Sequence, residues 1–204
     1  LETHSSYSLP PTMCYYVYDM LSNDVVDNQS ITTKGKSFRY ENKYVKPFSR
    51  LNDFTIRETV FLGNKLYVQN SVRQYMNYVI KLMQEIGFSG KCESASDPFF
   101  LAGNVANRIN VQTLLGSKYE LRLDIDNSDT IAVASFNLHG QFLSQRFHLY
   151  KDAAKQEYIY TGCVGVGLER LLFSFLCQFG SDEKQWPEII KNLLYQPKKI
   201  SEVI

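Results

Sequence analysis

Hydrophobic residues recur at helical spacing in two stretches of the chain. Within residues 72–86 they fall three or four positions apart, and Gly87 follows directly. The same spacing returns within residues 168–179, which end before Gly180. A stripe of this period gives a helix one apolar face, and a glycine after it is a common C-terminal cap. We therefore predict an amphipathic helix in each stretch, and a last short helix that starts near Pro187.

Other parts of the chain have the patterns of strands and turns. Residues 36–64 alternate between polar and apolar positions and are interrupted at Pro47, which predicts two antiparallel strands with a long loop between them. The turn-forming residues of 22–35 predict a loop. Further strands are predicted at residues 119–126, 130–138, 145–150 and 161–167. Together these patterns predict an α+β fold, an antiparallel β-sheet flanked by helices.

The composition fits one globular domain over residues 1–204. Hydrophobic residues make up 44% and charged residues 21%, which excludes a disordered chain. The net charge of 22 − 21 = +1 argues against a general nucleic-acid or membrane-surface binder, because such proteins need a positive face. No apolar run is long enough to span a membrane, and the first residues do not have the basic-then-apolar pattern of a signal peptide. Since the sequence begins with Leu1 rather than methionine, we allow for a missing N-terminal segment.

The four cysteines stand far apart and form no Cys-x-x-Cys pair. Four is too few for a disulfide scaffold in a chain of this length, so we expect a reducing compartment, the cytoplasm. An isolated cysteine is most often a buried small hydrophobe, although distant strands can also bring such cysteines together as metal ligands.

A charged strand and the segment after it carry the first candidate chemistry. Arg39 and Glu41 alternate with aromatic residues, so both project from the same face of a strand. The ordinary interpretation is a half-buried strand with a surface ion pair. The sharper one is a nucleotide site, in which Arg39 binds a phosphate, Glu41 accepts from an exocyclic amine, Arg50 binds a second phosphate and Phe54 stacks on a base.

A glycine-rich turn at residues 162–167 carries the second piece of candidate chemistry. It is neither a dinucleotide fingerprint nor a P-loop, because Arg170 replaces the third glycine of the first and no Gly-Lys-Ser/Thr follows. Arg170 falls in the first turn of the predicted helix, where a cation opposes the helix dipole at a cost of about 0.3–1 kcal/mol. That conflict indicates a bound anion. The alternative is a tight strand–helix corner with a solvated arginine.

Taken in order, the two motifs resemble motifs 2 and 3 of the class II aminoacyl-tRNA synthetases. That family has a catalytic core of antiparallel sheet and helices, and it activates an amino acid with ATP to form an aminoacyl-adenylate. The resemblance implies that Arg39 holds the α-phosphate and Glu41 the adenine amine. It also implies that Phe54 stacks on adenine, while Arg50 and Arg170 hold the outer phosphates. Arg39 and Arg170 are thereby the implied catalytic residues.

Three further residues narrow the resemblance. Cys14, Glu58 and Cys163 occur in the order of the zinc ligands of methanogen-type seryl-tRNA synthetases and of the related amino acid:[carrier protein] ligases. Two thiolates and a carboxylate make a three-ligand zinc site with an open fourth position. In that family the open position takes the amino group of the substrate, so Glu58 also borders the substrate. Cys92 and Cys177 have no such match, and we expect Cys177 to be structural.

The middle of the chain resembles the carrier-protein ligases at residues 96–100, 118–121 and 135–139. By that resemblance Asp97 contacts the substrate amine, and Glu120 and Asn137 lie near the Mg²⁺ of ATP, as hard oxygen ligands should. The alternatives are a turn-starting Asp97 before proline, and an outward strand face for Glu120 and Asn137. We interpret His139 as a satisfied hydrogen-bonding residue rather than a metal ligand.

The leading hypothesis is therefore an ATP-dependent ligase for a small amino acid. It would pass the activated acyl group to the phosphopantetheine thiol of a carrier protein, and act as a homodimer without tRNA or membrane. One alternative is a truncated synthetase, or a paralogue that serves tRNA or another acceptor. Another is a non-catalytic module on the same fold. No clear motif 1 is visible, and 204 residues hold little beyond a catalytic core.

Overall fold

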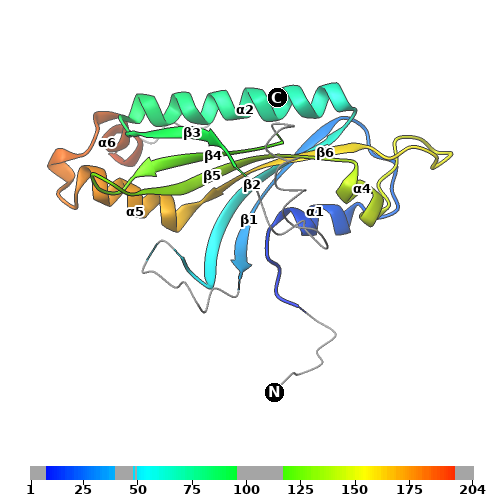
Figure 1. Cartoon of the computed structure of the whole chain (residues 1–204), viewed down its shortest axis with the longest axis horizontal. Coiled ribbons are helices and arrows are strands. Elements are labelled where there is room, and N and C mark those ends of the chain that lie inside the picture. The colour runs from blue at the N-terminus through cyan, green and yellow to red at the C-terminus, as the bar shows by residue number, and fades with distance from the viewer. Residues whose placement is uncertain (1–7, 40–47, 49, 96–116, 196–204) are drawn as a thin grey trace, which may run out of the picture.

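The computed structural model describes residues 8–39, 48, 50–95 and 117–195. These residues form an antiparallel six-stranded sheet in the order β1-β2-β6-β5-β4-β3 (Figure 1). The strands are β1 (Gln29–Phe38), β2 (Asp53–Gly63), β3 (Gly90–Ser94), β4 (Lys118–Asp124), β5 (Thr130–Gly140) and β6 (Tyr160–Gly167). Strands β2, β6 and β5 are central, so the glycine-rich strand lies between two partners.

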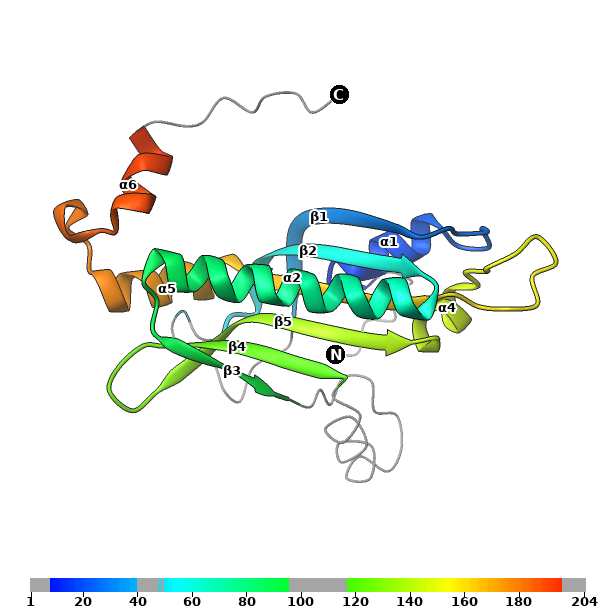
Figure 2. The same ribbon diagram turned by 90° about the horizontal axis from the view of Figure 1, so that it is seen from above.

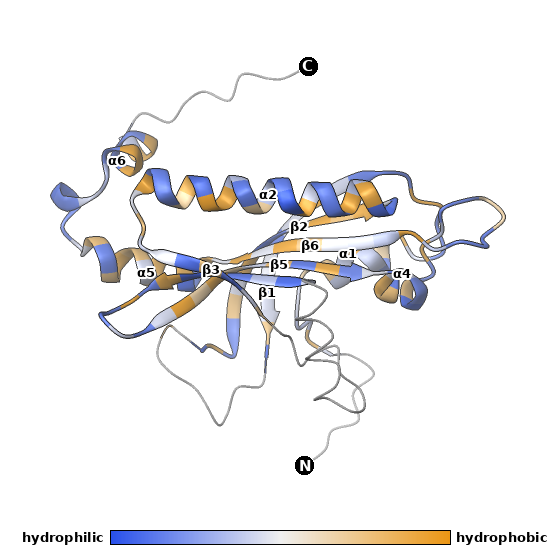
Figure 3. Cartoon of the chain, turned by 45° about the horizontal axis from the view of Figure 1, so that its top comes forward, coloured by the Kyte–Doolittle hydropathy of each residue, from blue (hydrophilic) through white to orange (hydrophobic). Residues whose placement is uncertain are grey.

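One long helix, α2 (Lys65–Ile86), lies over one face of the sheet (Figures 1 and 2). Hydrophobic and hydrophilic residues alternate along it, as expected for a helix with one buried side (Figure 3). Asn64 begins the helix, because its side chain accepts a hydrogen bond from the Tyr67 amide at 2.8 Å. Gly87 ends it with φ +96°, a left-handed conformation that glycine adopts without strain.

The other face of the sheet carries shorter helices at its two ends. Helices α1 (Cys14–Met20) and α4 (Phe142–Phe147) lie at one end, and α5 (Leu168–Phe179) lies at the other (Figure 1). A single 3₁₀ turn, η2 (Glu183–Gln185), connects α5 to the last described helix, α6 (Glu188–Tyr195). None of the described helices is both long enough and apolar enough to cross a membrane.

Strand alternation divides the core between the two faces. Phe61, Phe136 and Val164 belong to the cluster that packs against α2. Cys163, next to Val164, belongs to a second cluster with Tyr18 of α1. Neighbouring residues of a strand point to opposite faces, so the same strands form a core on one side and a polar site on the other.

The predicted α+β architecture is confirmed, as are the two amphipathic helices, the hairpin of β4 and β5, and the final short helix. Two predictions were wrong. Residues 22–35 are not all loop, because β1 begins at Gln29. It pairs antiparallel with β2, and Gln29 lies opposite Leu62. Residues 145–150 do not form a strand: α4 ends at Phe147, where His148 takes a left-handed φ of +55°. The sequence patterns also missed α1 and β3.

Candidate functional site

A cavity of about 310 Å³ opens on the face of the sheet opposite α2. Its walls come from the segment before α1, from β2, β4, β5 and β6, and from the first turn of α5. It therefore collects side chains that are far apart in sequence. Seven of the predicted site residues line it: Cys14, Arg39, Phe54, Glu58, Glu120, Asn137 and Cys163, and Arg170 makes an eighth.

Cys14, Glu58 and Cys163 form a compact cluster at one end of this cavity. Their ligand atoms all lie within 4.8 Å of one another, and all three side chains are buried. The sheet register explains why: Val60 pairs with Cys163 and Glu58 pairs with Gly165, so Glu58 and Cys163 share a face. We call these three residues the Cys/Glu cluster.

Hydrogen bonds fix the carboxylate of the Cys/Glu cluster. Glu58 Oε2 accepts from the Cys14 backbone N–H at 2.7 Å and from Thr12 Oγ1 at 3.1 Å. The first amides of a helix have no partner within it, so Glu58 satisfies one such group at the start of α1. The carboxylate thereby ties α1 to β2 and brings Cys14 to the cluster.

The chemistry of these donors fits a divalent metal ion. A hydrogen bond with Cys14, burial and the nearby Glu58 together raise the pKa of the Cys163 thiol well above its ordinary value. Acidic groups this close oppose one another's ionisation, and a bound cation reverses that balance. Two sulfurs and one oxygen are a set that zinc accepts in sites with an open position. Residues Cys14, Glu58 and Cys163 could therefore hold Zn²⁺.

Glycine keeps the space beside the Cys/Glu cluster open. Gly165 pairs with Glu58 on one side and with Ser135 on the other. A Cβ atom at Gly165 would lie 3.8 Å from Glu58 Oε1, 3.8 Å from Ser135 Oγ and 3.6 Å from Ile56. These are ordinary van der Waals contacts, so the fold tolerates a side chain there. The absence of one leaves a hollow for a small group.

Arg39 and Phe54 lie together elsewhere on the cavity wall. The Arg39 guanidinium sits 5.0 Å from the centre of the Phe54 ring, and its Nε donates to the Pro11 carbonyl at 3.2 Å. A cation over an aromatic face is held in place without losing its charge. The arrangement leaves a flat ring next to a positive, forked donor, which suits a base and a phosphate.

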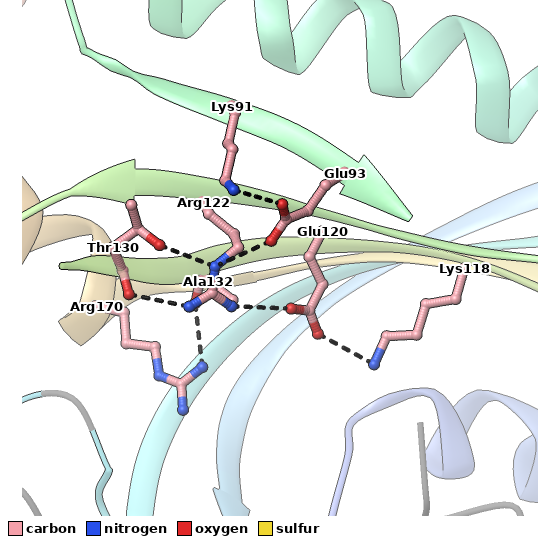
Figure 4. Close-up of polar contacts among 8 residues, drawn as sticks. All are labelled: Lys91, Glu93, Lys118, Glu120, Arg122, Thr130, Ala132 and Arg170. Atoms are coloured by element: carbon pink, nitrogen blue, oxygen red, sulfur yellow. Dashed lines mark hydrogen bonds and ion pairs between the residues drawn. The ribbon is translucent and has the colours of Figure 1, made fainter. Parts of the chain in front are cut away.

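Arg170 joins the cavity from the first turn of α5. Its Nη1 donates to the Ala132 carbonyl at 3.1 Å, which fixes the side chain against β5 (Figure 4). The sequence left a solvated arginine at a tight corner as the alternative; in the structure Arg170 lines the cavity and is partly exposed.

One predicted site residue that the structure describes does not line the cavity. Arg50 is exposed and is not among the residues that line it. Glu41 and Asp97 lie outside the described residues, so their roles stay predictions.

Glu120 lies in a chain of ion pairs along β3 and β4 (Figure 4). Its carboxylate pairs with Lys118 at 3.2 Å and with Arg122 at 3.3 Å, and Arg122 also reaches Glu93 at 3.5 Å. The Glu120 side chain is 22% exposed and lines the cavity, so it is not on an outward face. Its two cationic neighbours hold the carboxylate in place, and a carboxylate oxygen is a ligand of the kind that Mg²⁺ accepts.

Asn137 faces the Cys/Glu cluster. Its Nδ2 donates to Ser135 Oγ at 3.3 Å and lies 3.6 Å from Cys163 Sγ. The resemblance assigned this residue to the magnesium site, and its position beside Cys163 adds a contact that the sequence did not indicate. Of the other cysteines, Cys92 and Cys177 are both exposed.

Glu169 is a functional residue that the sequence analysis missed. Its carboxylate accepts from the Thr55 amide at 2.8 Å and from Thr55 Oγ1 at 2.7 Å, and it lies 3.8 Å from Lys36. These bonds fasten the first turn of α5 to β2 and so position the adjacent Arg170. Partial burial alone would raise the pKa of Glu169, but the bonds from Thr55 and the charge of Lys36 lower it on balance.

Replacing Glu169 with alanine is expected to lower the free energy of unfolding by about 1–3 kcal/mol at pH 7, because donors on Thr55 lose their acceptor. The folded-state pKa of Glu169 is lowered, so its contribution is present above the unfolded pKa and is lost as the pH falls below about 4. Urea titrations at pH 7 and at steps down to about pH 3 check this. The exposed Glu85→Ala variant is the control, and a loss that stays the same down to about pH 3 would contradict the assignment.

The sequence is similar to those of class II aminoacyl-tRNA synthetases. A family model for the tRNA synthetase class II core domain (G, H, P, S and T) matches residues 1–179. Type-2 serine–tRNA ligases of Methanococcus aeolicus and Methanococcus maripaludis are 33% and 30% identical to the chain. The first alignment covers 100% of this chain and the second 97%, but each covers only 40% of the relative. The chain thus spans two fifths of the length of these relatives.

A solved structure gives the same picture of the fold. M. kandleri SerRS, in its complex with A. aeolicus tRNASec, superposes with a TM-score of 0.76 at 23% identity. The superposition covers 94% of this chain and 40% of that one. At this level of identity the likeness concerns the arrangement of sheet and helices.

Proposed function

Because the chain belongs to the class II aminoacyl-tRNA synthetase core family, we propose that it uses ATP to activate a small amino acid as an aminoacyl-adenylate. One observation carries this proposal. A single cavity is lined both by the Cys/Glu cluster and by Arg39, Phe54 and Arg170. A metal site for an amine and a site for a nucleotide thus border the same space, as an enzyme that joins the two substrates requires.

The proposed first step is an in-line displacement at phosphorus. The substrate carboxylate attacks the α-phosphorus of ATP, the bond to the bridging oxygen breaks, and pyrophosphate leaves. An ionised carboxylate is already a nucleophile, so no protein base has to remove a proton. Catalysis then consists of positioning and charge stabilisation.

Three of the proposed nucleotide contacts are made by residues of the cavity wall. Arg39 stabilises the negative charge that develops on the α-phosphate, and Phe54 packs against the adenine ring. Arg170, held by the Ala132 carbonyl, takes the outer phosphates together with Arg50. Glu41, which would accept from the adenine amine, and Asp97, which would contact the substrate amine, complete the proposed set.

The metal ions have distinct roles in this proposal. Cys14, Glu58 and Cys163 would hold Zn²⁺, which would supply an open position for the free amine of the substrate. Mg²⁺ near Glu120 and Asn137 neutralises phosphate charge. The absence of a side chain at Gly165 leaves room for a substrate group next to the Cys/Glu cluster.

The acceptor of the activated amino acid has two candidates. The names of the similar proteins favour serine as the amino acid and tRNA as the acceptor. The resemblance of residues 118–121 and 135–139 to the carrier-protein ligases favours the thiol of a phosphopantetheine arm instead. Both acceptors use the same adenylate, so the first step can be tested before the second. We propose that residues 1–204 act as one catalytic domain in either case.

Pyrophosphate exchange tests the first step directly. We expect exchange that depends on one or two small amino acids, with serine first, and about one zinc bound per chain. Exchange should be measured for all standard amino acids, with metal content determined on the same sample. Bound zinc without exchange for any amino acid would contradict adenylation and favour a non-catalytic module.

The second step is tested by offering both acceptors with the preferred amino acid in radioactive form. Label should enter either serine tRNA or a phosphopantetheine-bearing carrier protein. A carrier protein that lacks the prosthetic arm and a tRNA without its 3′ end are the matched controls. Label in neither acceptor would contradict both candidates and leave adenylation as the established step.

A further inference from the structure

His139 connects the Cys/Glu cluster to a fully buried tyrosine. On β5 it lies two residues beyond Asn137 and so on the same face of the sheet. Its Nε2 lies 3.6 Å from Cys163 Sγ, and its Nδ1 lies 3.2 Å from the hydroxyl of Tyr18 in α1. Thr161 Oγ1 lies 3.5 Å from the same Nδ1. The imidazole therefore bridges a cysteine on β6 and a phenol on α1.

We propose that Tyr18 and His139 are positioning residues that orient the Cys163 sulfur toward a bound metal ion. This inference rests on the proposed metal centre. It assigns Tyr18 the task of orienting the imidazole, and it assigns His139 the task of donating a hydrogen bond to the sulfur.

The direction of the hydrogen bonds follows from the chemistry of each group. A thiolate can only accept, so His139 must present an N–H at Nε2 when Cys163 is ionised. In a neutral imidazole, Nδ1 is then an acceptor, and the hydroxyl that faces it must donate. Tyr18 provides that hydroxyl and is 0% exposed, so water cannot take its place. With the imidazole neutral, this pattern satisfies the hydrogen bonds of all three groups together.

His139 supports the Cys/Glu cluster without being one of its ligands. Among the described residues, the ligand atoms that all lie within 4.8 Å of one another belong to Cys14, Glu58 and Cys163. His139 is not in that group, although its Nε2 is close to one sulfur. Asn137 Nδ2 lies at the same distance from Cys163 Sγ, so β5 presents two N–H donors to that sulfur. Donors to a metal-bound group fix its orientation and tune the metal, and losing one such partner typically costs about 10–100-fold in metal affinity.

The structure allows the Tyr18 hydroxyl to be removed without changing the packing. The Tyr18 ring packs against Phe147, with 5.5 Å between centroids, and belongs to the core cluster on this face. A Tyr18→Phe variant keeps those contacts and loses the hydrogen bonds of the hydroxyl, which are to His139 and Thr161. It therefore separates orientation of the imidazole from stability of the core.

The test is zinc affinity of the full chain, measured by competition with a chromophoric chelator. We expect Tyr18→Phe and His139→Leu to bind zinc about 10–100-fold more weakly. His139→Gln should recover most of the affinity, because its amide N–H can reach the position of Nε2. Tyr75→Phe is the matched control, since the Tyr75 hydroxyl bonds to Thr59 on the other face of the sheet.

Cobalt(II) provides a second readout that a purely structural role would not move. In the Co²⁺-loaded chain, the thiolate-to-metal absorption band should shift in Tyr18→Phe and His139→Leu, but not in Tyr75→Phe. Wild-type affinity and an unchanged band in both variants would overturn the inference while leaving the metal centre intact. A wild-type chain that binds neither Zn²⁺ nor Co²⁺ would overturn both. If His139→Leu does not fold, Tyr18→Phe carries the test alone.

Discussion

A Cys163→Ser variant is expected to lose its zinc and to lose amino-acid-dependent pyrophosphate exchange by at least about 100-fold, the order that removal of one preorganised catalytic group costs. Serine is close in size to cysteine, but its hydroxyl stays protonated at neutral pH and is a poor ligand for zinc. Cys163 is 3% exposed, and Asn137 and His139 both present donors that a serine oxygen can accept. The fold should therefore persist while the centre is lost.

Three measurements on the same sample decide this prediction: metal content, exchange rate and the far-ultraviolet circular dichroism spectrum. Cys177→Ser is the control, because Cys177 is exposed on α5 and takes no part in the Cys/Glu cluster. Full exchange by Cys163→Ser without bound metal would remove zinc from the mechanism. An unfolded variant would instead show that Cys163 is needed for the core.

Local signals explain why much of the fold could be predicted from the sequence. The stripe of α2 and the glycine that ends it are encoded within a few turns, and the same is true of α5. Elements with weaker local signals were missed or misplaced. β1 is an edge strand rich in threonine, serine and lysine, so its polar run looks like a loop until its pairing with β2 is known. α4 is only one and a half turns long and depends on Ser144, which donates to the Ile159 carbonyl 15 residues away.

The candidate site was predictable for a different reason. Cys14, Glu58 and Cys163 were singled out because their order resembles a known zinc site, and the structure places them together. Periodicity alone could not have done so, because the register between β2 and β6 decides which side chains share a face. Contacts between distant segments stayed invisible for the same reason. Tyr18 and His139 are 121 residues apart, and Thr55 and Glu169 are 114 apart.

An Arg39→Ala variant is expected to keep its zinc and to lose pyrophosphate exchange by at least about 100-fold. A general loss of structure would instead remove both the zinc and the exchange. The Arg39 guanidinium lies 5.0 Å from the centre of the Phe54 ring, and its Nε is held by the Pro11 carbonyl, so the guanidinium is fixed before substrate binds. Losing it removes a charge-assisted, forked donor from the α-phosphate. The Cys/Glu cluster is held by other hydrogen bonds, from the Cys14 amide and from Thr12 to Glu58, so it should keep its metal.

An Arg39→Lys variant separates the effect of the two parallel guanidinium donors from the effect of the positive charge. Lysine restores a positive group but not two parallel donors, so partial recovery of exchange is expected, with a larger defect in the rate at saturating ATP than in ATP binding. Arg57→Ala is the matched control, because Arg57 is exposed on β2 and its Nη1 contacts Thr32 of the edge strand instead of lining the cavity. If Arg39→Ala retained wild-type exchange, the nucleotide would have to bind elsewhere, and Phe54 would lose its assignment with it. If Arg39→Ala lost zinc as well, the two ends of the cavity would be coupled. The loss of exchange could then not be assigned to the nucleotide site alone, which would contradict the prediction.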